Sequence, residues 1–269
     1  MAAGRQSPTA LRQWLVRLGH LYFDDFLLLA PETLDPGHWT PELASDWTLA
    51  TNNAPHVELR FRSANCSLQP AACELTASPP SLVDVLAAQQ RLVTHFAYEL
   101  LRAKAPPLYD SLPWHDWDFS IVTKRFRLWQ TRFLLAGDGT TATMCRCRKS
   151  AGVYIVEPEE TIARYIELKC AKQKVRRLKL LRAGLDCIPL PDNSVDLAVF
   201  GSVPSLDTGD WKLATREATR VSHNVLLVEN NPLLQSLDEK SLMDSGLQPA
   251  SVAVSGFGQR RCWWRTSSA

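Results

Sequence analysis

Two glycines and a carboxylate are the residues of this chain whose types and spacing favour ligand chemistry. Gly137 and Gly139 follow a short apolar run, Phe133 to Ala136, that has the length of a buried strand. Glu157 comes seventeen residues after Thr140, at the end of a second apolar run. Glycine lets a backbone turn sharply and approach a ligand closely. A carboxylate at the tip of a neighbouring strand can accept hydrogen bonds from both hydroxyls of a ribose, so this spacing favours a ligand that carries one.

The elements that must position these residues are a series of alternating strands and helices. Helices are expected directly after Glu157-Pro158, from Asp210, and near 233–245. Strands are expected at 133–136, 153–156, 178–181, 195–200, 224–229, 251–255 and 261–265. This order predicts an α/β fold, a doubly wound and mostly parallel sheet that ends in an antiparallel hairpin.

The first 125 residues predict a smaller α+β accessory region, which can pack on the sheet of a second domain at 126–269. A helix is expected at 10–20, and a longer one begins after Ser81, with Asp84 completing a capping box, and runs to about residue 103. His56–Arg62 alternates apolar and polar residues, as a half-exposed strand does, and 72–76 is a second β-like run.

Composition is that of a globular protein and gives no sign of a membrane-spanning segment or of a metal site. The 269 residues are 45% hydrophobic and 22% charged, which is ordinary for a globular protein, and no apolar run approaches membrane-spanning length. The seven cysteines are irregularly spaced, which predicts free thiols, no metal site and a cytoplasmic location. The alternative location is mitochondrial, because the N-terminus carries arginines and an apolar face at Leu11, Leu15 and Leu18.

A cluster of aromatic and polar residues at 112–119 directly precedes the glycine-rich stretch. One interpretation is a packed connecting loop whose tryptophans cover the edge of the sheet. The other is a rim of the ligand pocket, because a segment in this position can fold over the tips of the strands. The sequence leaves both open.

Several stretches in the same order resemble the class I (seven-strand, Rossmann-like) S-adenosylmethionine-dependent methyltransferases. The resemblance covers about Trp129 to Arg265. Leu134–Thr140 is similar to the family's Gly-x-Gly-Thr loop, and Glu157 matches its acidic residue after the second strand. Ile188–Leu197 is similar to the family's Leu-Pro-Phe-Pro-Asp-Asn-Ser-Phe-Asp-Leu segment, and Arg216–Val221 to the helix before its fifth strand.

This resemblance implies S-adenosyl-L-methionine as the cofactor and direct methyl transfer to an unidentified acceptor. The cofactor-binding residues that it implies are Gly137, Asp138, Gly139, Thr140, Glu157, Leu185, Asp186 and Phe200. Such chemistry needs mainly alignment of the acceptor, so catalytic residues stay unassigned. His115 or Asp116 can take a proton where the acceptor must lose one. A small molecule or a protein is favoured over RNA as the acceptor, because a net charge of +2 does not indicate a clustered basic surface.

Three positions depart from the family's pattern. Thr141 stands where a third glycine is usual, Gly184 stands where an acidic residue meets the adenine, with Asp186 displaced by two, and 222–224 replaces a Pro-Gly-Gly turn. The first two leave open a methyltransferase-like scaffold without turnover, with a protein partner on the tryptophan-rich N-terminal region. A nicotinamide-dependent dehydrogenase is a poorer alternative, because it expects the longer G-x-G-x-x-G pattern and gives the Pro189–Asp196 segment no role.

Overall fold

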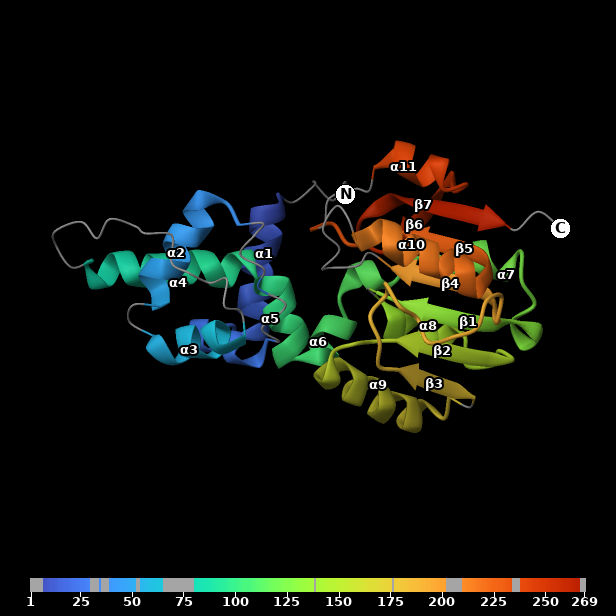
Figure 1. Cartoon of the computed structure of the whole chain (residues 1–269), viewed down its shortest axis with the longest axis horizontal. Helices are drawn as coiled ribbons and strands as arrows, with labels where there is room; N and C mark the ends of the chain where they lie inside the picture. The colour runs from blue at the N-terminus through green and yellow to red at the C-terminus, as the bar shows by residue number, and fades with distance from the viewer. Residues whose placement is uncertain are drawn as a thin grey trace. The chain divides into compact units, whose positions relative to one another are not determined.

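The chain forms two compact units, one within Gln6–Tyr109 and the other beginning at Asp110. The computed structural model describes residues 7–29, 34, 39–51, 54–64, 80–137, 139–175, 177–201, 210–233 and 238–266, without the side chains of 62–64 and 210–212. Figure 1 shows the helical unit in blue to green-blue and the sheet unit in green to red. Residues 110–125, which the sequence-based division placed with the N-terminal region, thus belong to the sheet unit.

The regular elements in the described part of the first unit are all helices. Its elements are α1 (Pro8–Gly19), η1 (Phe23–Leu28), α2 (Pro41–Thr51), α3 (Pro55–Ala64), α4 (Leu82–His95), α5 (Ala97–Lys104) and α6 (Pro106–Asp110), whose last residue opens the second unit. The helix expected at 10–20 is confirmed as α1. The helix expected after Ser81 is also present, with Ser81 Oγ accepting from the Asp84 N–H at 3.2 Å, but it breaks at Phe96 into α4 and α5.

The strand expected at His56–Arg62 is wrong, because this run lies within helix α3. Val57 and Phe61 are both fully buried and lie four residues apart, so they share one face of a helix, whereas Leu59 is 67% exposed. Pro55 is the first residue of α3, a position that proline tolerates. The described part of this region is therefore helical rather than α+β, and the second β-like run, 72–76, lies outside the described residues.

The second unit confirms the predicted doubly wound sheet. Its strands are β1 (Arg132–Ala136), β2 (Gly152–Val156), β3 (Leu178–Leu181), β4 (Val195–Gly201), β5 (Ser222–Val228), β6 (Gln248–Val254) and β7 (Gly258–Thr266). They are arranged in the order β3-β2-β1-β4-β5-β7-β6. The first five run parallel, and β7 is antiparallel to both of its neighbours. This is the Rossmann-like methyltransferase fold.

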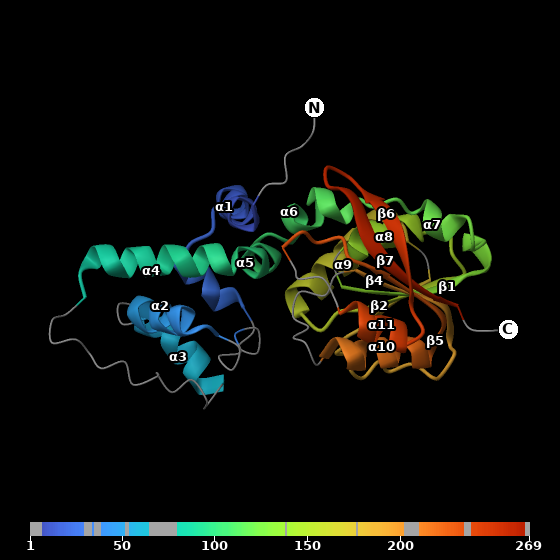
Figure 2. The ribbon, with the colours of Figure 1, turned by 90° about the horizontal axis from the view of Figure 1, so that it is seen from above.

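Helices cover both faces of this sheet. Figure 2 shows α8 (Thr140–Arg146) and α9 (Glu160–Gln173) on one side of it, and α10 (Asp210–Val221) and α11 (Glu239–Asp244) on the other. Three short elements precede β1: η4 (Pro113–His115), α7 (Ser120–Thr123) and η5 (Leu128–Gln130). The core beneath α10 and α11 is built from alternate residues of neighbouring strands, among them Leu134, Ala198 and Val225. The helix expected near 233–245 is shorter than predicted where it is described, as α11.

Candidate functional site

The glycine-rich turn lies at the carboxyl ends of the parallel strands, at the point where the strand order reverses. Ala136, the last residue of β1, is in register with Val156 of β2 on one side and with Phe200 of β4 on the other. In open α/β sheets, ligands bind outside the carboxyl ends of the strands at such a reversal. The fold therefore places the loop that follows Ala136 at the usual binding position.

The backbone of this loop needs its glycines. Gly137 has a φ of 75° and Gly139 a φ of 73°, in the left-handed region that other residues rarely adopt. Thr140 Oγ1 donates to the Gly137 carbonyl, and the Thr143 N–H donates to the Gly139 carbonyl at 2.9 Å, so the turn leads directly into α8. Thr141, at the place of the family's third glycine, is buried within the first turn of α8. Asp138 lies outside the described residues.

Glu157 follows β2 and is only 5% exposed. Its own N–H donates to the Leu181 carbonyl of β3 at 3.0 Å, which fixes the backbone at the tip of the sheet. Its carboxylate oxygen Oε1 accepts from the Glu159 N–H at 3.0 Å, just before α9 begins. The side chain thus supports the start of this helix, and it does so directly beside the end of β1.

The turn at Trp114 and His115 lies against the glycine-rich loop. A Cβ atom added to Gly139 would lie 3.4 Å from His115 Cβ and 3.5 Å from Asn230 Nδ2. Asn230 follows β5, and its Nδ2 donates to the Trp114 carbonyl at 3.1 Å. His115 is 1% exposed and Asn230 is fully buried. Segments before β1, after β1 and after β5 therefore meet here, as expected if residues near 115 form a rim of the site.

The rest of this segment runs along the edge of the sheet, as the other interpretation of the aromatic cluster expects. Trp117 forms an isolated antiparallel bridge with Val254 of β6, and the Asp118 N–H donates to the Ala253 carbonyl at 2.7 Å. Asp116 forms an ion pair with Arg146 of α8. Of the two residues considered for proton transfer, His115 is thus the one that lies against Gly139.

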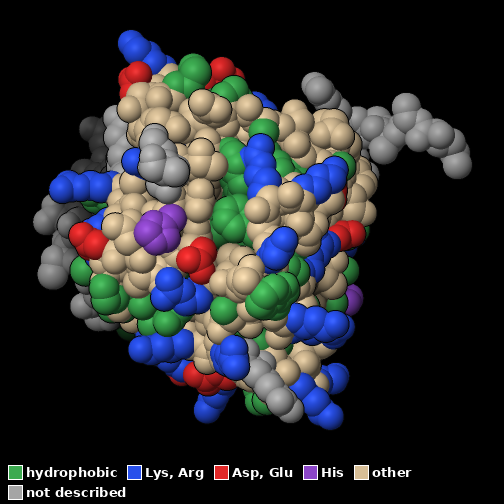
Figure 3. Space-filling model, turned by 90° about the vertical axis from the view of Figure 1, so that its right-hand side faces the viewer, with side chains coloured by type: hydrophobic (Ala, Val, Ile, Leu, Met, Phe, Trp, Pro, Cys, Tyr) green, Lys and Arg blue, Asp and Glu red, His purple; other side chains and the backbone are tan. Residues whose placement is uncertain are grey.

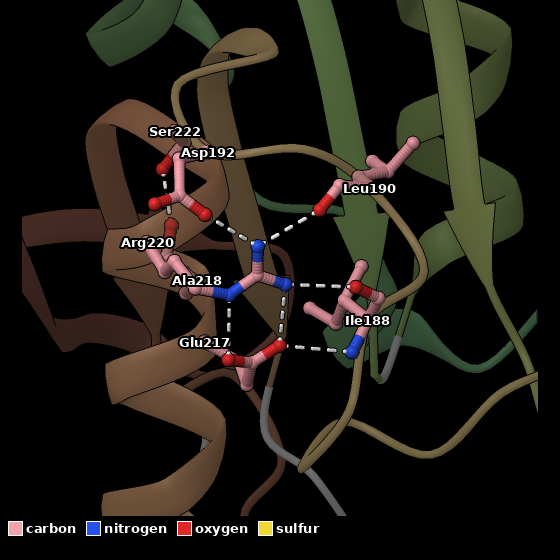
Figure 4. A network of polar contacts seen from close by, with 7 residues as sticks. All are labelled: Ile188, Leu190, Asp192, Glu217, Ala218, Arg220 and Ser222. Atoms are coloured by element: carbon pink, nitrogen blue, oxygen red, sulfur yellow. Dashed lines mark hydrogen bonds and ion pairs between the residues drawn. The ribbon is translucent and has the colours of Figure 1, made fainter.

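A network of polar contacts fixes the segment between β3 and β4 to α10 (Figure 4). Arg220 donates from Nη1 to the Leu190 carbonyl and to Asp192, each at 2.8 Å, and from Nη2 to the Ile188 carbonyl at 2.9 Å. Glu217 accepts from Arg220 at two positions and from the Ile188 N–H at 3.0 Å. The hydrogen bonds from Arg220 lower the pKa of the Glu217 carboxyl. The segment that resembles the family's second motif is therefore held in one conformation.

The other cofactor-binding residues that the resemblance implies differ in how far they are buried. Leu185 is half-buried against the core, and Asp186 is exposed. A side chain at Gly184 would meet the Asp186 carboxylate, so this carboxylate lies over the position that the family's acidic residue occupies. Phe200 is 2% exposed and lies in the core cluster with residues of α10. The structure therefore brings Gly137, Gly139 and Glu157 together but places Phe200 in the core.

Asn230 is the contact that sequence reasoning missed. The sequence marked it only as the residue that ends a strand, yet it is buried at the carboxyl edge and holds the Trp114 turn. No local pattern indicates this contact, because Asn230 and Trp114 lie 116 residues apart in the sequence. Within the described residues, no helix has the length and apolar character to cross a membrane. Nor does this part of the chain bring together three or more His, Cys, Asp or Glu side chains that could hold a metal.

Comparison with known proteins finds likeness among solved structures. No family model and no curated protein matches the chain. A SAM-dependent methyltransferase from Aquifex aeolicus is 19% identical, with a TM-score of 0.42, over 59% of this chain and 94% of that one. Magnesium protoporphyrin IX methyltransferase from Synechocystis PCC 6803, solved with bound SAM, is 14% identical, with a TM-score of 0.45, over 55% and 76%. A SAM-dependent methyltransferase from Methanosarcina mazei is 12% identical, with a TM-score of 0.42, over 56% and 99%.

Proposed function

We propose that this protein is an S-adenosylmethionine-dependent methyltransferase that binds its cofactor at the carboxyl ends of β1 and β2. One observation carries the proposal: the positive-φ turn at Gly137 and Gly139 and the carboxylate of Glu157 follow adjacent strands, whose last residues are in register. Both features thus lie at the strand tips where open α/β sheets bind nucleotide-like ligands.

The residues present fit such a ligand. The two glycines let the backbone approach it without a side chain in between. Glu157 accepts from the Glu159 N–H through Oε1, and a carboxylate is the kind of acceptor to which ribose hydroxyls donate. Asp186, whose carboxylate lies over Gly184, can meet the adenine amino group in place of a side chain at that position.

The chemical demands on this chain are modest. When bound, the sulfonium cofactor supplies an activated methyl group, and the protein must align the acceptor with it. His115 lies against Gly139 and its imidazole can accept a proton, whereas Asp116 is already paired with Arg146. We therefore assign to His115 the removal of a proton from acceptors that must lose one. The acceptor is proposed to be a small molecule or a protein.

A second candidate is a binding or scaffold protein that retains the fold without turnover. It is supported by the close packing of His115 and Asn230 against Gly139 and by the use of the Glu157 carboxylate at the start of α9. These contacts are all made within the chain, so they stabilise this region without a bound ligand. In this case the helical first unit is the proposed surface for a protein partner.

The two candidates are separated by binding and by turnover. Calorimetric titration of the folded full-length protein with S-adenosylhomocysteine is expected to give saturable heat. Absence of heat at about millimolar ligand, which corresponds to less than about 4 kcal/mol of binding free energy, would contradict the methyltransferase proposal. Binding together with transfer of labelled methyl groups to a fraction of cell extract supports the enzyme. Binding without transfer to any fraction supports the scaffold.

We also propose that the protein acts in the cytoplasm. The cysteines of the described residues, Cys145, Cys147, Cys170, Cys187 and Cys262, are free thiols, which suits a reducing compartment. Burial raises the pKa of the Cys262 thiol to about 11, so it remains protonated at neutral pH. Fluorescence microscopy of the protein tagged at its C-terminus tests the location, and co-localisation with mitochondria would favour the alternative.

A further inference from the structure

The amino ends of β1, β2 and β3 lie at the end of the sheet opposite to the proposed cofactor site, and we call this end the amino edge. Arg132 begins β1, and its Cγ lies 3.9 Å from a Cβ atom added to Gly152, which begins β2. The Ala151 N–H donates to the Thr131 carbonyl, and the Val153 N–H donates to the Arg177 carbonyl, both at 3.0 Å. The segments that lead into the three strands are therefore in direct contact along this edge.

These segments are rich in exposed cations. We define the amino-edge band as Lys124, Arg125, Arg127, Arg132, Arg148, Lys149, Lys172, Lys174 and Arg177, all exposed. The Arg125 guanidinium also lies over the ring of Trp264 in β7, 4.5 Å from the ring centroid. Figure 3 shows this face, with blue side chains from its centre to its lower margin and few red ones among them.

Few acidic groups of the described residues balance this charge. Asp196 pairs with Arg132 at 3.5 Å. The pKa of Asp118 is lowered mainly by hydrogen bonds from Ser120 and to a smaller extent by the charge of Lys124. In the part of the chain that the structure describes, Arg127, Arg148 and Lys149 form no ion pair with an acidic side chain. The band holds nine of the chain's 30 Lys and Arg residues and no acidic one, so the rest of the chain has more acidic than basic residues although the net charge of the whole is +2.

The helix dipole accounts for only part of the band. Lys172 and Lys174 lie at the end of α9, and Arg148 and Lys149 follow the end of α8, where cations are stabilised by the helix C-terminus. Arg132 is the first residue of β1, Arg177 directly precedes β3 and Arg127 directly precedes η5, so none of the three lies in a last helical turn. Local helix stability therefore gives no reason for the charge of these three arginines.

An exposed aromatic ring lies within the same band. Trp129 belongs to η5, between Arg127 and Arg132, and is 64% exposed. A large aromatic side chain open to water among arginines is the arrangement by which proteins stack unpaired bases while cations contact the phosphates. A membrane surface would need several apolar side chains to insert, and Trp129 is the one large hydrophobic side chain exposed among the described residues of this band.

We propose that the amino-edge band binds single-stranded nucleic acid, with phosphates on its arginines and lysines and a base on Trp129. The net charge of the chain does not by itself indicate a clustered basic surface, so composition disfavours RNA as a ligand. The fold nevertheless brings cations from separate segments together into such a cluster. The band lies at the opposite ends of the strands from Gly137 and Glu157, so it is a binding surface separate from the proposed methyl-transfer site. Nucleic-acid binding by the band therefore does not depend on methyl transfer by the protein.

Fluorescence anisotropy with the full chain tests this proposal. The probes are labelled oligouridylate and oligothymidylate of about 20 nucleotides, at about 50 and about 200 mM salt. The first variant, Arg127→Ala/Arg148→Ala/Lys149→Ala, is expected to bind at least about tenfold more weakly at low salt. Its salt dependence should fall by about 0.7 in logarithmic slope for each phosphate that the variant no longer neutralises. The second variant, Trp129→Ala, is expected to bind about tenfold more weakly with an unchanged salt slope.

A matched control removes the same charge outside the band. Arg164, Arg216 and Lys240 are exposed on α9, α10 and α11, and their triple replacement by Ala should leave oligonucleotide affinity within about twofold, since it removes no proposed phosphate contact. The melting temperature of every variant is measured alongside, because all these positions are exposed and should tolerate replacement.

Three results would overturn the proposal. The first is absence of oligonucleotide binding by the folded protein at low salt. The second is an equal loss of affinity in the band and control variants. The third is binding to phosphatidylserine vesicles but not to oligonucleotides, which would mark a membrane surface instead. Oligouridylate bound more tightly than oligothymidylate identifies RNA as the ligand, and the reverse identifies DNA.

Discussion

The two edges of the same sheet carry opposite kinds of residues. At the carboxyl edge, the residues around Gly139 are small or polar and almost completely buried, with His115 and Asn230 packed against the loop. At the amino edge, Arg127, Arg148 and Lys149 extend into solvent without acidic partners among the described residues. The first edge depends on precise packing, and the second depends on charge and tolerates replacement of single side chains.

This difference follows from the direction of the chain in a parallel sheet. Each of the first five strands begins at the amino edge and ends at the carboxyl edge. The turns that carry cations therefore lie one strand length away from the turns that need glycine or buried polar groups. A substitution at one edge should therefore leave binding at the other unchanged, unless it unfolds the core that both edges share.

The largest effect is expected in this shared core. Replacement of Phe200, which is 2% exposed in the cluster beneath α10, by Ala should destabilise the protein by about 3–5 kcal/mol, through reduced burial of apolar surface and the cavity left behind. Chemical denaturation measures this. If Phe200→Ala instead keeps its stability and loses only S-adenosylhomocysteine affinity, Phe200 contacts the cofactor and does not belong to the core.

Replacement of a loop glycine should affect the carboxyl edge alone. Gly139→Val forces a β-branched residue into a φ of 73°, which costs about 1–3 kcal/mol, and pushes its side chain toward His115 and Asn230. Gly256→Val is the matched control, because Gly256 has a φ of 74° but no atom within 4 Å of an added Cβ. Only Gly139→Val should abolish S-adenosylhomocysteine binding in calorimetry, and equal binding by both variants would place the ligand elsewhere. Oligonucleotide affinity should be unchanged in both.

Glu157→Gln sharpens the role of the buried carboxylate. The amide oxygen can still accept from the Glu159 N–H, so the start of α9 and the melting temperature should be nearly preserved. Loss of the charge should weaken S-adenosylhomocysteine binding by about tenfold, which is about 1.4 kcal/mol. Glu167→Gln, at an exposed position of α9, is the control. A lower melting temperature with intact affinity would show that Glu157 serves only the helix.

The smallest expected effect concerns the polar network at Arg220. Since Arg220 lowers the pKa of Glu217 in the folded protein, this carboxylate contributes stability above its unfolded pKa of about 4.3, and the contribution is lost as the pH falls through the folded value. Glu217→Gln should therefore cost no more than about 1 kcal/mol at pH 7 and nothing at low pH. Urea denaturation across this pH range measures it, and a pH-independent cost would contradict the ionic contribution.

Local sequence patterns predicted the sheet because its strands are short, apolar and separated by clear turns. Phe133–Ala136 has no polar residue and is buried, so it fits no other element of that length. The same reasoning failed at His56–Arg62, because apolar residues at 57 and 61 satisfy both a strand of period two and one face of a helix. Seven residues are too few to separate these two periods.

The candidate site was predictable only where it is local in sequence. Gly137 and Glu157 carry recognisable residue types at a recognisable spacing. The contact between Asn230 and the Trp114 carbonyl joins positions 116 residues apart and leaves no local pattern. The amino-edge band was predictable only in part: Lys124, Arg125, Arg127 and Arg132 form a small basic run in the sequence, of a kind that is usually a solvated face. The other cations of the band come from separate turns, which become neighbours only when β1, β2 and β3 pair.

The bridge between Trp117 and Val254 also has a consequence for solubility. An open sheet has two outer strands, and their unpaired N–H and carbonyl groups can recruit strands from other molecules. Part of the outer side of β6 is already paired with the segment 116–118. The Asp118 N–H donates to the Ala253 carbonyl, and the Ser255 N–H donates to the Asp116 carbonyl at 2.8 Å. A protein cut at residue 125 would lose this cover and leave β6 open to self-association, whereas one cut before Asp110 would keep its outer strand capped.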